Sequence, residues 1–320
     1  RKEEKLKNIL VMGAGGQIGS ELIPALRKIY GKNNVVASDI RNDVSDVLKD
    51  GPFEILDCLD SAKITEVIKK FKIDTVYNLV ALLSAVGEQN PLLSWKINVG
   101  GLINLLEMAR EYKFALFTPS SIGAFGNSTP HDDTPQDTIM RPNSMYGVTK
   151  VSGELLADYY HQKYGIDTRG VRYPGIISHA TLPGGGTTDY AVEIFYKAIQ
   201  EKQFICNLNA GTYLDMMYMP DCVKAAIDIM EADPSKLIHR NCFNVAAMSF
   251  EPETIAAEIR KHIPEFTMTY DNDVIRQAIA ESWPNKMDDS AAREEWNWKH
   301  TYELPEMTKD MLKVLSEKLK

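Results

Sequence analysis

The chain has 320 residues, 44% of them hydrophobic and 25% charged, which is enough for one large globular domain or for a large and a small one. Its formal net charge of −8 argues against a nucleic-acid or anionic-membrane partner, because both need a basic surface. With no apolar run long enough to cross a bilayer and no signal-like start, we expect a cytoplasmic protein, or a mitochondrial-matrix protein if a transit peptide has been removed.

Short apolar runs alternate with stretches of helical period through the first half of the chain. Strands are predicted at residues 8–12, 34–38, 53–56, 74–79, 114–118 and 168–173. Helices are predicted at residues 17–30, 61–71, 91–112 and 145–164. Pro24 is expected to kink the first helix, unless the predicted helical register is wrong there. Because the strands are apolar throughout, the pattern predicts an α/β fold in which helices cover both faces of a doubly wound parallel sheet.

The second half of the chain has a looser pattern. Helices are predicted at residues 191–201, 222–231, 252–263, 273–282 and 308–320. Few strands remain for a sheet of their own. We therefore expect a first domain at residues 1–175 and a smaller, mostly helical lobe at residues 176–320, partly interleaved with it. The four cysteines and six histidines are scattered, which predicts neither disulfides nor a metal site.

A glycine-rich turn follows the first predicted strand. Gly13, Gly16 and Gly19 have the spacing G-x-x-G-x-x-G, and a helix begins among them. Glycines let the backbone turn tightly and approach a diphosphate, while the free N–H groups at a helix start attract that anion. Asp39 ends the second strand 20 residues after Gly19, where a carboxylate can bind both ribose hydroxyls of an adenosine. This arrangement predicts a Rossmann-type dinucleotide site.

Asp39 also indicates which dinucleotide is bound. Its carboxylate would repel a 2′-phosphate, which favours NAD over NADP. Arg41, two residues later, would instead favour NADP, since a guanidinium can bind such a phosphate. We predict NAD.

The segment "YGVTK" places Tyr146 and Lys150 one helical turn apart. Taken alone, such a pair is typical of a surface contact between helical neighbours. Beside a nicotinamide, however, a phenol can exchange a proton with an alcohol, and a nearby ammonium favours the phenolate. Ser120 and Ser121 follow the fifth strand, where one hydroxyl can orient the substrate oxygen. These residues predict a proton-relay site.

The motifs "GAGGQIG", "SSIGAFG" and "YGVTK" resemble the short-chain dehydrogenase/reductase superfamily, in its extended branch with sugar-nucleotide epimerases and dehydratases. The resemblance implies that Ser121 is the catalytic hydroxyl, that Tyr146 is the acid/base and that Lys150 is its partner, with Ser120 as the alternate serine. It implies a cofactor site formed by Gly13, Gly16, Gln17, Ile18, Gly19, Asp39, Ile40, Arg41, Asp57, Cys58, Leu79, Ala81, Asn98, Tyr146, Lys150, Tyr173 and Ile176.

The second half, with "LPGGGTTDYAVEIFYKAI" and "MDDSAAREEWNWKHTYEL", is similar to the L-threonine 3-dehydrogenases of this superfamily. That similarity implies oxidation of the threonine β-hydroxyl to 2-amino-3-oxobutanoate with NAD and without a metal. The block at residues 184–189 is where a small zwitterion would be held, and it could close over substrate. The candidate substrate residues are Ser84, Ser121, Tyr146, Thr187, Thr188 and Asp189.

Two alternatives remain open in the sequence. The first is a UDP-sugar 4-epimerase with retained NAD, for which Arg240, Arg260 and Arg276 could supply basic groups. The second is a non-catalytic regulator that binds NAD. Whatever the function, the apolar faces of the helices predicted at 91–112 and 145–164 favour a homodimer, since members of the superfamily commonly pair through these helices.

Overall fold

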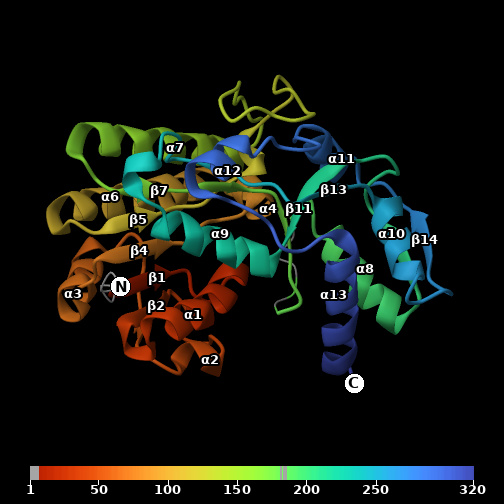
Figure 1. Ribbon diagram of the computed structural model, residues 1–320, viewed down its shortest axis with the longest axis horizontal. Coiled ribbons are helices and arrows are strands. Elements are labelled where there is room, and N and C mark those ends of the chain that lie inside the picture. The colour runs from red at the N-terminus through yellow and green to blue at the C-terminus, as the bar shows by residue number, and fades with distance from the viewer. Residues whose placement is uncertain (1–6, 181, 183–185) are drawn as a thin grey trace.

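A six-stranded parallel sheet forms the centre of the large lobe (Figure 1). The computed structural model describes residues 7–180, 182 and 186–320. The strand order is β3-β2-β1-β4-β5-β7. The strands are β1 (Ile9–Met12), β2 (Val35–Asp39), β3 (Phe53–Ile55), β4 (Thr75–Asn78), β5 (Ala115–Phe117) and β7 (Thr168–Arg169). The order reverses between β1 and β4, so the predicted doubly wound sheet is confirmed and its crevice lies at that reversal.

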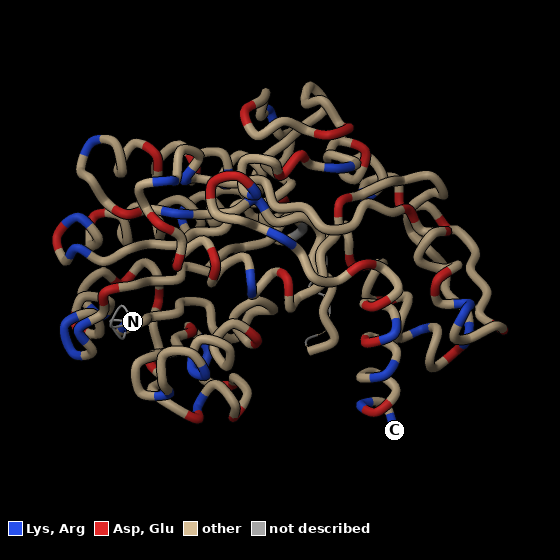
Figure 2. The backbone as a smooth tube through the Cα atoms, viewed as in Figure 1, with Lys and Arg blue, Asp and Glu red and all other residues tan. Residues whose placement is uncertain are grey.

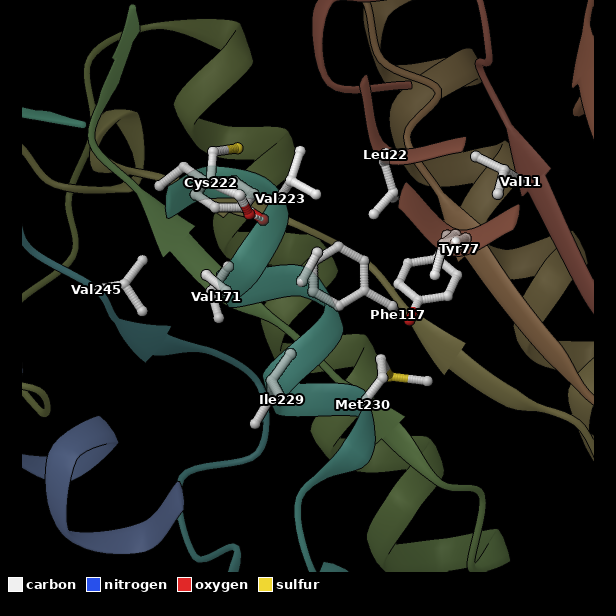
Figure 3. Close-up of a cluster of buried hydrophobic side chains, with 14 of the residues drawn as sticks. Val11, Leu22, Tyr77, Phe117, Val171, Cys222, Val223, Ile229, Met230 and Val245 are labelled. Atoms are coloured by element: carbon white, nitrogen blue, oxygen red, sulfur yellow. Dashed lines mark hydrogen bonds between the residues drawn. The ribbon is translucent and has the colours of Figure 1, made fainter. Parts of the chain in front are cut away.

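Helices cover both faces of this sheet. Side chains of α1 (Gln17–Tyr30), α9 (Met219–Glu231) and α12 (Ser290–Trp296) share one apolar cluster with β1, β2, β4 and β5. Side chains of α3 (Ser61–Phe71), α6 (Gly101–Tyr112) and α7 (Met145–Tyr164) fill the cluster on the opposite face. Figure 3 shows Val223, Ile229 and Met230 of α9 gathered around Phe117 and Tyr77 of the sheet. This double coverage is the reason for the continuous apolar runs in the sequence.

Several helices differ in detail from the sequence prediction. Helix α1 runs through Pro24 as a single helix. The run at 91–112 consists of α5 (Pro91–Trp95), a π-helical turn η2 (Lys96–Gly100) and α6. The short elements α2 (Asp46–Lys49), α4 (Ser84–Gln89), α12, η1 (Lys32–Asn34), η3 (Ile122–Ala124) and η4 (Pro234–Lys236) were not predicted.

The strand predicted at 168–173 is two strands. After β7, the chain leaves the large sheet at Gly170 and continues as β8 (Val171–Tyr173), which pairs with β6 (Ser120–Ser121) and β12 (Phe243–Asn244). A Cβ atom on Gly170 would lie 2.4 Å from both the Thr118 carbonyl oxygen and the Cys242 sulfur. Glycine is therefore required where these three segments approach one another, and the prediction of one strand was wrong.

The smaller lobe contains two sheets that the sequence did not reveal. One has the order β13-β11-β9 and the other pairs β10 with β14. The strands are β9 (Gly175–Ile177), β10 (Gln203–Cys206), β11 (Leu214–Tyr218), β13 (Met248–Phe250) and β14 (Thr267–Tyr270). Around them lie α8 (Tyr190–Gln200), α10 (Pro252–Arg260), α11 (Val274–Glu281) and α13 (Leu304–Lys318), with a core of their own. The expectation that few strands remain here was wrong, although helices still predominate.

The two halves of the chain are interleaved. Helix α9 packs on α1, and β12 pairs with β8, so both return to the side of the large sheet. The Asp221 carboxylate, near the start of α9, accepts hydrogen bonds from the backbone N–H groups of Thr301 and Tyr302 at 2.8 and 2.9 Å. The division after residue 175 remains a proposal, with α9, β12 and α12 lying on the large-sheet side of it.

Acidic and basic residues are interspersed along the backbone (Figure 2). None of the helices in the described part of the chain is long and apolar enough to span a bilayer.

The contact at Gly170 gives a test of the fold. In Gly170→Ala the added methyl group meets backbone and sulfur atoms that have little room to move, so we expect a loss of about 1–3 kcal/mol in the free energy of unfolding, measured by urea denaturation. Gly100→Ala is the control, because its Cβ would have only ordinary contact, 3.9 Å from Leu59, and alanine favours a helix. Equal stability of the two variants would contradict this account.

Candidate active site

The glycine turn between β1 and α1 forms one wall of a groove of about 510 Å³. Gly13 has a φ of +81°, which L side chains rarely adopt, and a Cβ on Gly19 would lie 2.6 Å from the Gly13 carbonyl oxygen. The absence of side chains thus lets α1 start tightly against the turn, with its N–H groups at the groove. The groove is lined by Gly13, Gly15, Gly16, Gln17, Ile18, Gly19, Arg41, Leu79, Ala81, Leu83, Pro119 and Leu182.

Asp39 lies at the end of β2 and is nearly buried. One carboxylate oxygen accepts the Gly15 N–H at 2.8 Å and the other accepts the Arg41 N–H at 3.0 Å. The Arg41 guanidinium is 3.5 Å from the same carboxylate and bonds to the Gly15 carbonyl at 3.2 Å. Asp39 therefore holds the glycine turn in place, and Arg41 is 56% exposed beside it.

The other residues implied near the adenine lie close by along the chain. Ile40 is 65% exposed. Asp57 and Cys58 follow β3, where the Leu56 N–H bonds to the Asp39 carbonyl at 3.0 Å. Burial raises the pKa of the Cys58 thiol to about 11. The described lining of the groove includes neither Asp57 nor Cys58, so the structure places them just after β3, the strand that pairs with β2, and not on the groove wall.

A second pocket of about 190 Å³ adjoins the groove. The two share Gln17, Ile18, Leu79, Ala81, Leu83 and Pro119. Of the predicted catalytic and substrate residues, the pocket brings together Ser84, Ser120, Ser121, Tyr146, Lys150, Thr187, Thr188 and Asp189, with Tyr173 and Ile176 beside them. Residues from β6, α7, β9 and the segment before α8 thus meet at one place next to the glycine turn.

Tyr146 lies in the first turn of α7. This helix begins at Met145 and is capped by Ser144, whose hydroxyl accepts the Gly147 N–H at 3.1 Å. The Lys150 ammonium lies 5.4 Å from the centre of the Tyr146 ring and bonds to the Pro119 carbonyl at 2.8 Å. Tyrosine and lysine are therefore neighbours, as their spacing predicts.

Gly123 brings the tyrosine close to the serines. A Cβ at this position would lie 3.2 Å from the Tyr146 ring and 3.4 Å from the Ser121 hydroxyl oxygen. The Ser121 oxygen accepts the Gly123 N–H at 3.1 Å. By contrast, the Ser120 hydroxyl is buried and donates to the Glu154 carboxylate. The two adjacent serines thus have different partners.

Lys150 also lines a small chamber of about 30 Å³ next to the pocket, with room for about two water molecules. Asn98, from the π-helical turn, lines this chamber together with Asn78, Thr149 and Lys150. The Asn98 side chain donates to the Thr149 hydroxyl at 3.1 Å and also exchanges hydrogen bonds with both backbone groups of Leu82. The structure therefore places Asn98 on the wall of the same chamber as Lys150, and it is not among the described residues that line the groove.

The substrate end of the pocket is less completely described. Ser84 and Thr187 are buried, and the Asp189 carboxylate accepts the Gly186 N–H at 2.6 Å. Gly184 and Gly185, at the start of the predicted loop, lie outside the described residues. The prediction that this loop closes over substrate therefore stays a prediction. Trp283 packs in the core of the smaller lobe and is also part of the pocket wall. Nothing in the sequence around it indicates that position.

The arginines considered for a nucleotide sugar lie elsewhere. Arg240 is buried and bonds to Asp167 at 2.7 Å, while Arg260 and Arg276 pair with Glu253 and Asp273. Lys150 is the only cationic side chain among the described residues that line the pocket. In the described part of the chain, no cluster of three or more histidine, cysteine or acidic side chains could hold a metal ion.

The fold and this site are those of a dinucleotide-dependent enzyme of the Rossmann type. The family model "NAD dependent epimerase/dehydratase family" matches residues 9–246, and the chain belongs to this family. An uncharacterized epimerase/dehydratase of Staphylococcus saprophyticus is 54% identical over 316 residues, covering 98% of this chain and 99% of that protein.

Solved structures of high similarity are threonine dehydrogenases. The L-threonine dehydrogenase of Clostridium difficile is 56% identical with a TM-score of 0.96, covering 98% of both chains. A monomeric L-threonine 3-dehydrogenase from a metagenome is 40% identical with a TM-score of 0.92, covering 98% of this chain and 100% of the other. The family and these neighbours support an NAD-dependent oxidoreductase and imply that it binds NAD(H). The glycine turn fits that group, since side chains at Gly13 or Gly19 would collide with backbone.

The geometry of Asp39 gives a test of cofactor choice. Asp39→Asn keeps an acceptor for the Gly15 N–H but removes the charge. We expect NAD affinity to fall roughly tenfold, because hydrogen bonds from ribose hydroxyls to a carboxylate are stronger than those to an amide. The preference for NAD over NADP should also weaken, since the repulsion of a 2′-phosphate is gone and Arg41 remains. Calorimetric titration with both dinucleotides measures this, with the exposed Asp46→Asn as a control. Unchanged affinities would contradict the assignment.

Proposed function

We propose that the protein oxidises the β-hydroxyl of L-threonine to 2-amino-3-oxobutanoate, with hydride transfer to NAD, as a step of threonine catabolism. The observation that carries this proposal is the convergence of Tyr146, Ser121 and Lys150 on one pocket that adjoins the glycine-turn groove. The high similarity to L-threonine dehydrogenases over nearly the whole chain supports the choice of substrate.

The proposed mechanism gives the proton to Tyr146. When bound in the groove, NAD would supply the acceptor for the hydride of the substrate β-carbon. The Tyr146 phenolate accepts the hydroxyl proton as general base, and no metal ion is assigned a role. The Lys150 ammonium, 5.4 Å from the centre of the Tyr146 ring, and the amino-terminal end of α7, in whose first turn Tyr146 lies, place positive charge beside the phenol. The Ser121 hydroxyl orients the substrate oxygen, since it faces the same pocket beside the ring.

The proposed cofactor residues follow from the groove and its surroundings. The glycine turn and the start of α1 would hold the diphosphate, and Asp39 would accept the adenosine ribose hydroxyls. Tyr173 and Ile176 line the pocket at the end where the nicotinamide would lie. The Lys150 ammonium is also close enough to the pocket to bond to the nicotinamide ribose.

The substrate end suits a small zwitterion. Ser84, Thr187 and Thr188 present hydroxyl groups that could donate to a carboxylate, and the Asp189 carboxylate offers a counter-charge for an ammonium. A nucleotide sugar, in contrast, carries a diphosphate that requires cationic partners. Arginines at 240, 260 and 276 are engaged with acidic residues away from the pocket. The pocket therefore favours the amino acid over a UDP-sugar.

An assay decides between the candidate functions. Purified protein with NAD should form NADH steadily when L-threonine is added, followed by absorbance of the reduced nicotinamide. Turnover of UDP-galactose without net NADH would favour a 4-epimerase. Binding of NAD without turnover of any amino acid, hydroxy acid or UDP-sugar would favour a regulator.

The role of the phenol is tested by Tyr146→Phe. We expect kcat to fall at least roughly a hundredfold, the usual contribution of a positioned acid or base, while NAD affinity stays unchanged. Tyr164→Phe, at the far end of the same helix, is the control and should keep full activity. Wild-type turnover in Tyr146→Phe would exclude the proposed base.

We also propose that two copies of the chain pair through α7 and the neighbouring continuous run of α5, η2 and α6. Their outer faces present apolar side chains, among which Leu92 is 84% exposed and Leu155 is 60% exposed, with Trp95 and Tyr159 close to half exposed. Exposed apolar side chains gathered on adjoining helices are typical of an interface. A monomeric relative is known, so the state of this chain needs its own measurement.

The proposed pairing is tested by Leu92→Glu combined with Leu155→Glu. Buried carboxylates at an interface without partners are costly, so the variant should elute and scatter light as a monomer while the wild type does so as a dimer. Ile238→Glu, at another exposed apolar position, serves as the control and should leave the dimer intact. A wild-type monomer at assay concentration would contradict the proposal.

A further inference from the structure

A buried ion pair lies directly behind the two serines. The Glu154 carboxylate on α7 accepts two hydrogen bonds from the Arg172 Nε, at 3.0 and 3.2 Å, and one from its Nη2 at 2.8 Å. The Ser120 hydroxyl donates to the same carboxylate. The side chains of Glu154 and Arg172 are only 3% and 5% exposed. The hydroxyl of Ser120 is therefore held by a charged acceptor that is almost fully shielded from bulk solvent.

Arg172 extends this network to three other segments. Its Nη1 donates to the Gln136 carbonyl at 2.7 Å and to the Asn244 side-chain oxygen at 3.0 Å. Asn244, fully buried in β12, donates in turn to the Thr134 and Asp288 carbonyls, both at 3.1 Å. The arginine is thus fixed from several sides, and it fixes the position of Glu154.

The pairing of β6 with β8 explains why this matters for the site. Ser120 is opposite Arg172 and Ser121 is opposite Tyr173, and neighbouring side chains of a strand point to opposite faces. The two serines have the same chemistry, so neither side chain alone determines which hydroxyl faces the pocket. The Glu154 carboxylate on one face of the strand determines which serine turns toward it, because a charge-assisted hydrogen bond is stronger than a neutral one.

We propose that Glu154, held by Arg172, is a positioning residue that binds the Ser120 hydroxyl and thereby keeps the Ser121 hydroxyl in the pocket beside Tyr146. This inference rests on the proposed function in one respect, namely that Ser121 acts on the substrate. Neither Ser120 nor Glu154 needs to contact the substrate for its role. Their effect on turnover passes entirely through Ser121.

A double-mutant cycle separates this role from a merely structural one. In Ser120→Ala, kcat for L-threonine should fall roughly tenfold to a hundredfold, as for a misplaced catalytic group, with NAD affinity unchanged. In a Ser121→Ala background the same change should alter kcat by less than about twofold, because the group it positions is already gone. An equal loss in both backgrounds, or no loss in either, would overturn the proposal.

The same cycle with Glu154→Gln tests the carboxylate. When Ser121 is intact, we expect Glu154→Gln to lower kcat. When Ser121 is already replaced by alanine, the same change should alter kcat by less than about twofold. A loss of kcat that persists in the Ser121→Ala protein would overturn the role of Glu154. If Glu154→Gln does not fold, Arg172→Lys takes its place, with the same expected outcomes. Lysine keeps a positive charge opposite the carboxylate but cannot make the paired hydrogen bonds of the guanidinium. Thr168→Val is the control, since it removes a buried 3.0 Å hydrogen bond to α7 away from the pocket and should not change kcat.

A crystal structure of Ser120→Ala tests the positioning without any turnover. We expect the Ser121 side chain to occupy a different rotamer from the wild type or more than one rotamer. A single wild-type rotamer, held as before by the Gly123 N–H, would overturn the proposal. Should the wild-type protein fail to oxidise L-threonine, the proposed function would fail, whereas this structural result would still decide whether Glu154 orients the serines.

Discussion

The buried pair of Glu154 and Arg172 joins the parts of the molecule on which the site depends. A charge is costly to bury unless it is paired and fully hydrogen-bonded, so the two side chains tolerate only a narrow set of positions. Through this pair, helix α7 is fixed against β8 and, by way of Ser120, against β6. The same helix carries Tyr146 and Lys150 at its start. The buried ion pair therefore helps to fix the positions of Tyr146, Lys150 and the two serines relative to one another.

Much of the large lobe was predictable because its signals are local. Strands buried on both faces are apolar along their whole length, and the glycine spacing at Gly13 and Gly19 reflects a turn that excludes Cβ atoms. The proximity of Tyr146 to Lys150 follows from helical period alone. The proposed role of Ser121 comes from the family resemblance, because the local pattern leaves the choice open between two identical side chains.

The parts that the sequence did not reveal depend on contacts between distant segments. The break between β7 and β8 at Gly170 arises from crowding by Cys242, 72 residues further along the chain. Strands such as β12 are too short to show a sequence period. The choice between Ser120 and Ser121 depends on Glu154, 34 residues from Ser120. Trp283 reaches the pocket only because the smaller lobe folds against the larger one.

The return of α9 to the large sheet has a consequence for work with fragments. Its side chains cover Tyr77 and Phe117, which are almost fully buried in the intact chain (Figure 3). A polypeptide cut after residue 175 would retain the glycine turn and the tyrosine but leave that apolar face bare to solvent. Such a fragment is expected to aggregate rather than serve as an isolated nucleotide-binding module, so truncation is a poor way to separate coenzyme affinity from the rest of the enzyme.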